Sequence, residues 1–315
     1  GIIAEDHPLS AGIPSMAGAA ALIRTADVCI ALGTRFNEYT TLTWRTPMPK
    51  RLVRVDIDPT VLEQNYPAEV TLKGDVGAVL EWLAERLPSS KEGPSELQLA
   101  VTALRERREE ASRAFMSDHA ESSAPFHPRL VAHLLREALP PGAIVTSDGS
   151  ATESWLYEPG FSITQTGSLI VPEIQQTMGF AVGAAIGAAL GAPDRPVVAV
   201  VGDGSLMMAL GELATLAAEH ILLTVVVFND GAYNALRVRQ EAIYDQRYVG
   251  TFIGAVDFAQ IAHGLGLPGA RVESVDQLRQ LLAETSDARS PMLLDVPIDS
   301  APLSERYAAV VEAGG

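Results

Sequence analysis

The sequence is almost free of cysteine: Cys29 is the single one in 315 residues. One cysteine excludes a disulfide framework within the chain and any metal site built from several thiolates. A chain that does without disulfides fits a reducing compartment. We therefore expect a cytoplasmic protein.

Positive charge is also scarce. The chain has 23 Lys and Arg against 39 Asp and Glu, a formal net charge of −16. The electrostatic field of this net negative charge repels a phosphate backbone, so nucleic acid is not an expected partner. It does not exclude a small anionic cofactor, because backbone amides and a metal ion can hold one locally.

Long apolar runs are absent as well. The longest weakly polar run, residues 177–192, is built mainly from Gly and Ala. It is shorter than the roughly 20 residues that a membrane span needs, so we interpret it as a tightly packed buried helix. The first residues carry no basic start and no apolar core, so neither a signal peptide nor a membrane partner is expected.

What is present is an alternation of apolar strands and helices, which predicts the α/β class with parallel sheets flanked by helices. Residues 1–87 form a first unit with few strands, a partial Rossmann-like domain that looks incomplete at its N-terminal edge. Residues 88–124 form a linker with a charged helix, and residues 125–315 form a second, complete α/β unit. Strands are expected at 27–33, 51–59, 70–73, 143–146, 169–171, 197–201, 223–228 and 292–296, and helices at 17–25, 76–87, 96–115, 128–139, 179–190, 206–219, 258–264 and 275–285.

The strongest local signal is an apolar strand, 197–201, that ends in Gly202-Asp203-Gly204-Ser205. Glycines let the backbone turn sharply and approach a ligand closely. A helix that begins at once points free amides at an anion. A carboxylate such as Asp203 beside that anion makes chemical sense when a cation lies between them.

A second turn, Asn229-Asp230-Gly231, ends the next apolar strand. A right-handed crossover brings it beside the first turn, at the sheet edge where open α/β proteins bind ligands. Carboxylate, carbonyl and phosphate oxygens form a hard shell that suits Mg²⁺. Either tripeptide alone indicates only an ordinary turn, but the two at successive strand ends indicate a site.

With these two turns the chain resembles the thiamine-diphosphate (ThDP) enzymes, whose motif is Gly-Asp-Gly followed within thirty residues by Asn, usually Asn-Asn. The resemblance implies Mg²⁺ ligands at Asp203, Asp230 and the carbonyl of Ala232, with Asp230 in place of the usual second Asn. A shift of one residue would instead make Asn229 and the carbonyl of Gly231 the ligands, because strand ends are uncertain by a residue or two.

The same resemblance implies cofactor contacts. Met178 matches the bulky residue that separates the two cofactor rings, and the carbonyl of Gln176 would face the aminopyrimidine, although the family usually has smaller residues around Gln176. The turn after the strand at 143–146 is similar to a second diphosphate-contacting turn. The full set implied is Ser150, Ala151, Gln176, Met178, Gly202, Asp203, Gly204, Ser205, Ala232 and Tyr233, with Thr152 as a further hydroxyl.

The N-terminal segment is similar to the central domain of acetolactate synthases and benzoylformate decarboxylases. Some members bind FAD or ADP there. Because no glycine-rich phosphate fingerprint is complete in residues 1–87, we expect a structural role and do not favour FAD. The family's activating glutamate lies on an N-terminal pyrimidine domain that nothing in this chain matches. The catalytic glutamate is therefore expected from a missing domain, in the same or another chain, and the chain alone is expected to be inactive.

The resemblance implies decarboxylation or carboligation of 2-oxo acids by an acetolactate synthase-like enzyme. Two alternatives stay open: a benzoylformate-type decarboxylase, which the segment 233–237 favours, and a non-catalytic ThDP-binding fragment. Arg237 or Arg239 could meet a substrate carboxylate, although solvated surface arginines are the more common case. A homodimer or homotetramer is expected, because active sites of the family lie between subunits.

Overall fold

The structure is a computed structural model that describes residues 2–87, 95–286 and 290–312. It divides into two compact units, Pro8–Arg107 and Gly1–His7 with Arg108–Gly315. Residues 88–94 of the predicted linker lie outside the described residues. The predicted domain boundaries at residues 87 and 124 stay a prediction.

The smaller unit is built on a three-stranded parallel sheet, in the order β1-β2-β3. Its strands are β1 (Cys29–Leu32), β2 (Leu52–Asp56) and β3 (Val70–Lys73). Helices α1 (Ala17–Thr25) and α2 (Val76–Arg86) belong to it, and α3 (Glu96–Asp118) begins in it. The carboxylate of Asp75 caps α2 by accepting the N–H of Ala78 at 2.9 Å. These elements lie where the sequence predicts them.

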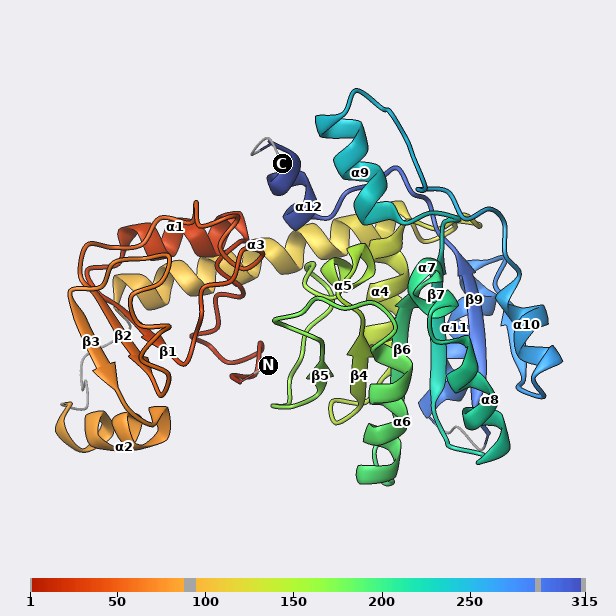
Figure 1. Ribbon diagram of the computed structural model, residues 1–315, viewed down its shortest axis with the longest axis horizontal. Helices are drawn as coiled ribbons and strands as arrows, with labels where there is room; N and C mark the ends of the chain where they lie inside the picture. Colours follow the sequence, from red (N-terminus) through yellow and green to blue (C-terminus); the bar gives the residue numbers. More distant parts are fainter. Residues whose placement is uncertain (1, 88–94, 287–289, 313–315) are drawn as a thin grey trace. The chain divides into compact units, whose positions relative to one another are not determined.

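The larger unit contains a six-stranded, all-parallel sheet in the order β5-β4-β6-β7-β9-β8 (Figure 1). The strands are β4 (Ile144–Ser147), β5 (Leu169–Ile170), β6 (Val197–Gly202), β7 (Thr224–Asn229), β8 (Gly269–Arg271) and β9 (Met292–Pro297). The central strands read as unbroken apolar runs because both of their faces are buried. The predicted fold class, α/β with helix-flanked parallel sheets, is confirmed.

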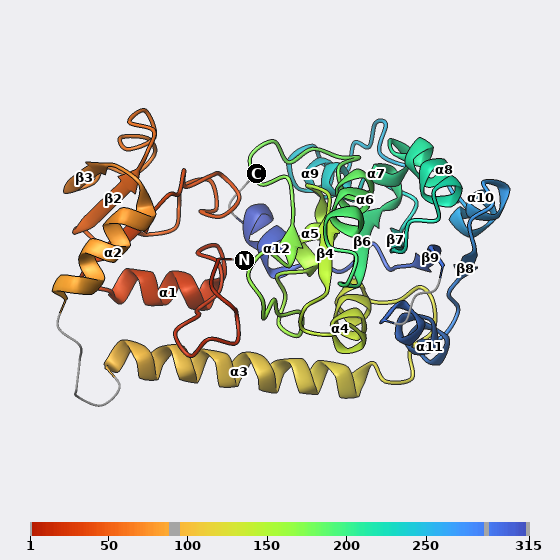
Figure 2. The same ribbon diagram turned by 90° about the horizontal axis from the view of Figure 1, so that it is seen from below.

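Helices cover both faces of this sheet, and the alternation of side chains along a strand explains how. Val198 and Val200 of β6 face a core with α4 (Pro128–Ala138) and α11 (Val275–Ser286). Val197, Ala199 and Val201 face the opposite core with α6 (Ala181–Gly191), α8 (Leu210–Ala218) and α10 (Phe258–Gly264). Figure 2 shows α4 and α11 on one side of the sheet and α6 and α8 on the other.

Some helices and one strand differ from those predicted from the sequence. The helix expected at 206–219 is two helices, α7 (Asp203–Met207) and α8, because the N–H groups of Met208 and Ala209 bond three residues back and close α7 as a tight turn. The helices α5 (Ala151–Trp155), α9 (Asn234–Ile243) and α12 (Glu305–Glu312) and the strand β8 were not predicted.

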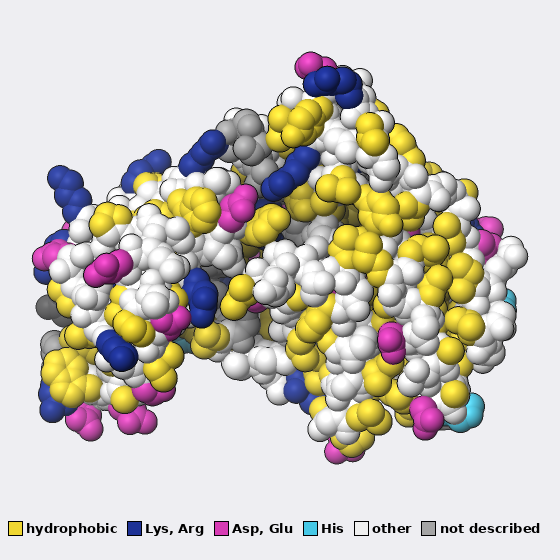
Figure 3. Space-filling view, viewed as in Figure 1, with side chains coloured by type: hydrophobic (Ala, Val, Ile, Leu, Met, Phe, Trp, Pro, Cys, Tyr) yellow, Lys and Arg dark blue, Asp and Glu magenta, His cyan; other side chains and the backbone are white. Residues whose placement is uncertain are grey.

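Two surface properties of the described residues bear on function. None of their helices combines the length and the apolar character needed to cross a membrane. Large apolar side chains are exposed around α6 to α9, where Figure 3 shows apolar atoms gathered on the larger unit. They include Met207, Met208, Leu236, Val249 and Phe252.

Candidate cofactor pocket

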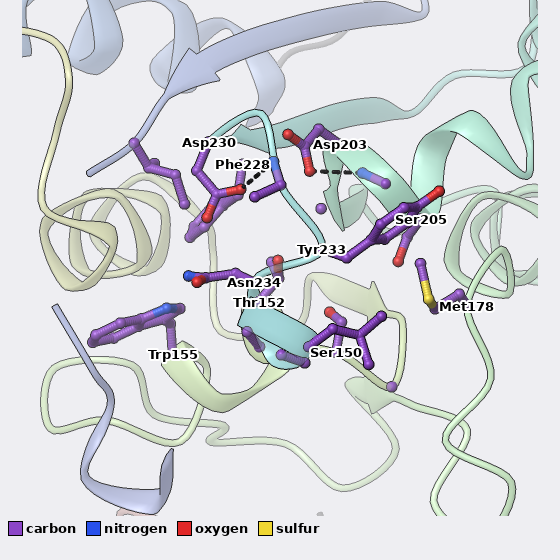
Figure 4. A pocket seen from close by; sticks show the side chains of 18 residues that line it. Ser150, Thr152, Trp155, Met178, Asp203, Ser205, Phe228, Asp230, Tyr233 and Asn234 are labelled. Atoms are coloured by element: carbon purple, nitrogen blue, oxygen red, sulfur yellow. Dashed lines mark hydrogen bonds between the residues drawn. The ribbon is translucent and has the colours of Figure 1, made fainter. Parts of the chain in front are cut away.

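A pocket of about 170 Å³ opens where β4, β6 and β7 end (Figure 4). Its walls come from the turns that follow these strands, the segment before α6, the first turn of α9 and the residue after β9. Its lining consists of Gly149, Ser150, Ala151, Thr152, Trp155, Met178, Gly202, Asp203, Gly204, Ser205, Phe228, Asp230, Ala232, Tyr233, Asn234, Ala235, Leu236 and Ile298. Ligands of open α/β sheets bind at this edge.

Asp203 joins the turns after β6 and β7. Its side chain is buried, and Oδ1 accepts the N–H of Gly204 at 2.6 Å. Oδ2 accepts the N–H of Gly231, also at 2.6 Å. One carboxylate thus holds both turns in register, which β6 and β7 allow because they are parallel neighbours.

Asp230 is the second carboxylate of the pocket. Its Oδ1 accepts the N–H of Ala232 at 3.2 Å, a bond drawn in Figure 4. Burial, followed by the charge of Asp203, raises the pKa of Asp230 to about 7. Burial also raises the pKa of Asp203. Two carboxylates whose pKa values are both raised are a donor set that a divalent cation would neutralise.

Asn229, the alternative ligand, faces away from the pocket. Its amide donates to the carbonyl of Val256 and to Oδ1 of Asp295, both at 2.8 Å. The carbonyl of Gly231, its companion in that alternative, accepts the N–H of Ile253 at 2.9 Å. Neither Asn229 nor Gly231 lines the pocket. Asp203, Asp230 and Ala232, the other predicted set, all line it.

The lining fits a diphosphate carried by a cation. Of the described residues that line it, none is Lys, Arg or His, so no side chain there offsets a polyanion. The hydroxyl of Ser150 is buried and finds no hydrogen-bond partner within the described part of the chain, which suits a ligand oxygen. The described residues hold no group of three His, Cys, Asp or Glu side chains that could bind a metal. A cation here would therefore need carbonyl or ligand oxygens besides the two carboxylates.

The segment before α6 is held against the turn after β4. Asp148 is buried, and its Oδ1 accepts the N–H groups of Phe180 and Ala181 at 2.6 and 2.9 Å, which caps α6. Gly149 allows a close approach, because a Cβ there would lie 2.4 Å from the backbone of Gln176. Met178 lines the pocket, whereas Gln176 does not.

One wall of the pocket, made by Trp155, Phe228, Leu236 and Ile298, is not predicted from the sequence. These residues come from α5, β7, α9 and the segment after β9, and tertiary packing alone brings them together. Asn234 was not predicted as a pocket residue either, although it lies only four residues after Asp230, which was.

Arg237 makes three side-chain hydrogen bonds within the protein. Its guanidinium donates to Oδ1 of Asn234 at 2.7 Å, to Glu241 at 2.7 Å and to the carbonyl of Ser300 at 2.5 Å. Its side chain is only 13% exposed. These bonds use three of the five N–H donors of the guanidinium, and Arg237 does not line the pocket.

Fold and pocket define the class of the larger unit: a parallel α/β domain with a ligand site at the carboxyl edge of its sheet. Comparison with protein families agrees. The thiamine pyrophosphate enzyme C-terminal TPP binding domain matches residues 148–296, and the thiamine pyrophosphate enzyme central domain matches residues 1–83. The chain belongs to the thiamine pyrophosphate enzyme family.

Curated relatives are acetolactate synthases. The acetolactate synthase large subunit of Parasynechococcus marenigrum (strain WH8102) is 31% identical over 309 residues, which cover 95% of this chain and 48% of the relative. The catabolic acetolactate synthase of Raoultella terrigena is 29% identical over 283 residues, 88% of this chain and 49% of the relative. Isozyme 2 of the large subunit from Escherichia coli (strain K12) is 28% identical over 304 residues, 95% and 53% of the two chains. The chain thus spans about half the length of these relatives.

Proposed function

We propose that this chain binds ThDP through Mg²⁺ and forms the diphosphate-binding part of an enzyme that decarboxylates or ligates 2-oxo acids. The observation that carries the proposal is the pair of carboxylates of Asp203, which is buried, and Asp230, which is half-buried, in a pocket whose described lining has no cationic side chain. An anionic cofactor fits such a pocket only together with a cation.

The residues have distinct roles in this proposal. Asp203, Asp230 and the carbonyl of Ala232 hold Mg²⁺, and the turn Gly202–Ser205 offers amides and a hydroxyl to the diphosphate. Met178 separates the cofactor rings. ThDP, when bound, supplies the nucleophile and the electron sink for cleaving the bond between the carbonyl and carboxylate carbons. The protein binds the diphosphate, orients the rings and excludes water.

Acetolactate synthase-like chemistry is the proposed activity, because curated relatives carry that name along nearly the whole of this chain. The activating glutamate is proposed to come from a pyrimidine domain outside these 315 residues, in the same or another polypeptide, since the relatives are about twice as long. The exposed apolar side chains around α6 to α9 support an assembly in which another domain or a second copy covers them (Figure 3).

Calorimetric titration of ThDP into the full chain tests the proposal, with Mg²⁺ and with a chelator. We expect ThDP to bind only when Mg²⁺ is present. Asp203→Asn should lower the affinity for ThDP at least tenfold. The matched control is Asp194→Asn, the same change at an exposed aspartate of the same unit. Equal binding with and without Mg²⁺, or equal binding by Asp203→Asn and Asp194→Asn, would contradict the proposed metal site.

A further inference from the structure

Asn234, the first residue of α9, lines the pocket in a place that the proposed function leaves unused. In Figure 4 its side chain is drawn between the indole of Trp155 and the carboxylate of Asp230. Because the described lining has two carboxylates and no Lys, Arg or His, each neutral donor in it matters to an anionic ligand.

The contact with Arg237 fixes which end of the Asn234 amide points where. Oδ1 of Asn234 accepts the Nε–H of Arg237 at 2.7 Å. A guanidinium carries donors and no acceptor, so the amide oxygen must face Arg237. The NH₂ group, with two donors, is left on the other branch of the amide.

Two further contacts of Arg237 support this orientation. Its Nη1 is paired with Glu241 and its Nη2 donates to the carbonyl of Ser300. The side chain is 13% exposed and therefore largely shielded from water. A planar guanidinium held at three points is a rigid support, which a lysine ammonium could only partly replace.

We propose that the side-chain NH₂ of Asn234 is a donor to the diphosphate, and that Arg237 is the positioning residue that aims it. This inference rests on the proposed function, because it takes the anionic ligand of the pocket to be a diphosphate. It assigns the start of α9, which follows the turn at Asp230, a role in binding the diphosphate of the cofactor. Arg237 acts through Asn234 and does not itself line the pocket.

The test uses the full chain with Mg²⁺ and inorganic pyrophosphate as the probe, followed by calorimetry. Asn234→Asp keeps the shape and can still pair with Arg237, but it replaces two donors by an anionic oxygen. We expect its affinity for pyrophosphate to fall at least tenfold with an unchanged unfolding midpoint, and Asn234→Ala to lose a smaller factor. Gln280→Glu, at an exposed position of α11, is the control for one added negative charge.

Arg237 is tested by its coupling to Asn234. Arg237→Met should weaken pyrophosphate binding as much as Asn234→Ala does, and the double variant should be no weaker than either. Arg237→Lys, which keeps one donor, should restore part of the affinity. A merely structural role would give additive losses in the double variant and overturn the positioning role.

Failure of this inference can be told apart from failure of the proposed function. If the unaltered chain binds pyrophosphate and ThDP with Mg²⁺, and Asn234→Asp binds them equally well, the role of Asn234 is overturned and the proposed function stands. If the unaltered chain binds neither, both are overturned.

Discussion

Replacing Gly204 with Ala should damage the pocket more than the fold. A Cβ at Gly204 would lie 2.5 and 2.6 Å from Cε1 and Cδ1 of the Tyr233 ring. Carbon atoms in contact prefer about 3.5–4.0 Å, so the ring has to retreat by roughly 1 Å. Tyr233 lines the pocket, and its movement changes the wall that faces the turn after β6.

Two opposing effects set the magnitude for stability. Gly204 lies inside α7, where alanine is favoured over glycine by about 1 kcal/mol. Overpacking a filled site costs about 1–3 kcal/mol. The net loss in free energy of unfolding should therefore be about 0–2 kcal/mol, while the affinity for pyrophosphate should fall at least tenfold.

Gly211 provides the matched control, because it also lies in a helix, α8, and a Cβ there would meet nothing within 4 Å. Gly211→Ala should raise the free energy of unfolding by about 0.5–1 kcal/mol and leave binding unchanged. Urea denaturation and calorimetry with pyrophosphate measure both quantities. If Gly204→Ala stabilised the chain as much as Gly211→Ala and bound pyrophosphate normally, the packing of Tyr233 on Gly204 would be refuted.

Three further predictions concern the support of the pocket. Gly149→Ala should cost about 1–3 kcal/mol in urea denaturation, because its Cβ would press on the backbone of Gln176 and not on a movable side chain; an unchanged midpoint would contradict this contact. Asp148→Ala should cost about 1–2 kcal/mol through loss of the α6 cap, and Asp148→Asn less, since one acceptor remains; equal losses would rule out the cap. Burial, followed by the charges of His119 and Arg129, lowers the pKa of His127 to about 4. Between about pH 6.5 and 4 the unfolded chain therefore binds a proton at His127 that the native chain does not bind. The free energy of unfolding should fall as the pH drops through this range. His127→Gln should flatten that dependence in pH-dependent urea midpoints, and an unchanged slope would contradict the prediction.

The central strands could be predicted because burial on both faces leaves a continuous apolar run, as in β6 and β7. The three-residue strand β8 could not, since Gly269–Arg271 is partly exposed and carries no alternation or apolar run. Helix α9 was missed because its polar residues bury only Val238 among its ten positions, which leaves little periodicity to detect. Short or exposed elements owe their structure to tertiary contacts more than to propensity.

The turns of the pocket are local features, and the sequence therefore predicts them, whereas the far wall is not local. Gly202–Ser205 and Asp230 follow directly from strands whose ends are visible in the sequence. Trp155 and Ile298 reach the same pocket from segments more than 140 residues apart, by packing around β7. No sequence motif near Trp155 or Ile298 predicts that either residue lines the pocket.

The choice between Asn229 and Asp230 shows where a local motif stops being informative. Side chains alternate along a strand, so Asn229 faces the same core as Val225 and Val227, where an unpaired amide would be costly. Asp295, fully buried on β9, accepts that amide and is itself paired with Arg271 at 2.6 Å. Because the side chain of Asn229 faces that core, it is Asp230, the first residue after the strand, that lines the pocket. Which member of an Asn-Asp pair faces the ligand is thus decided by a carboxylate 66 residues further along the chain.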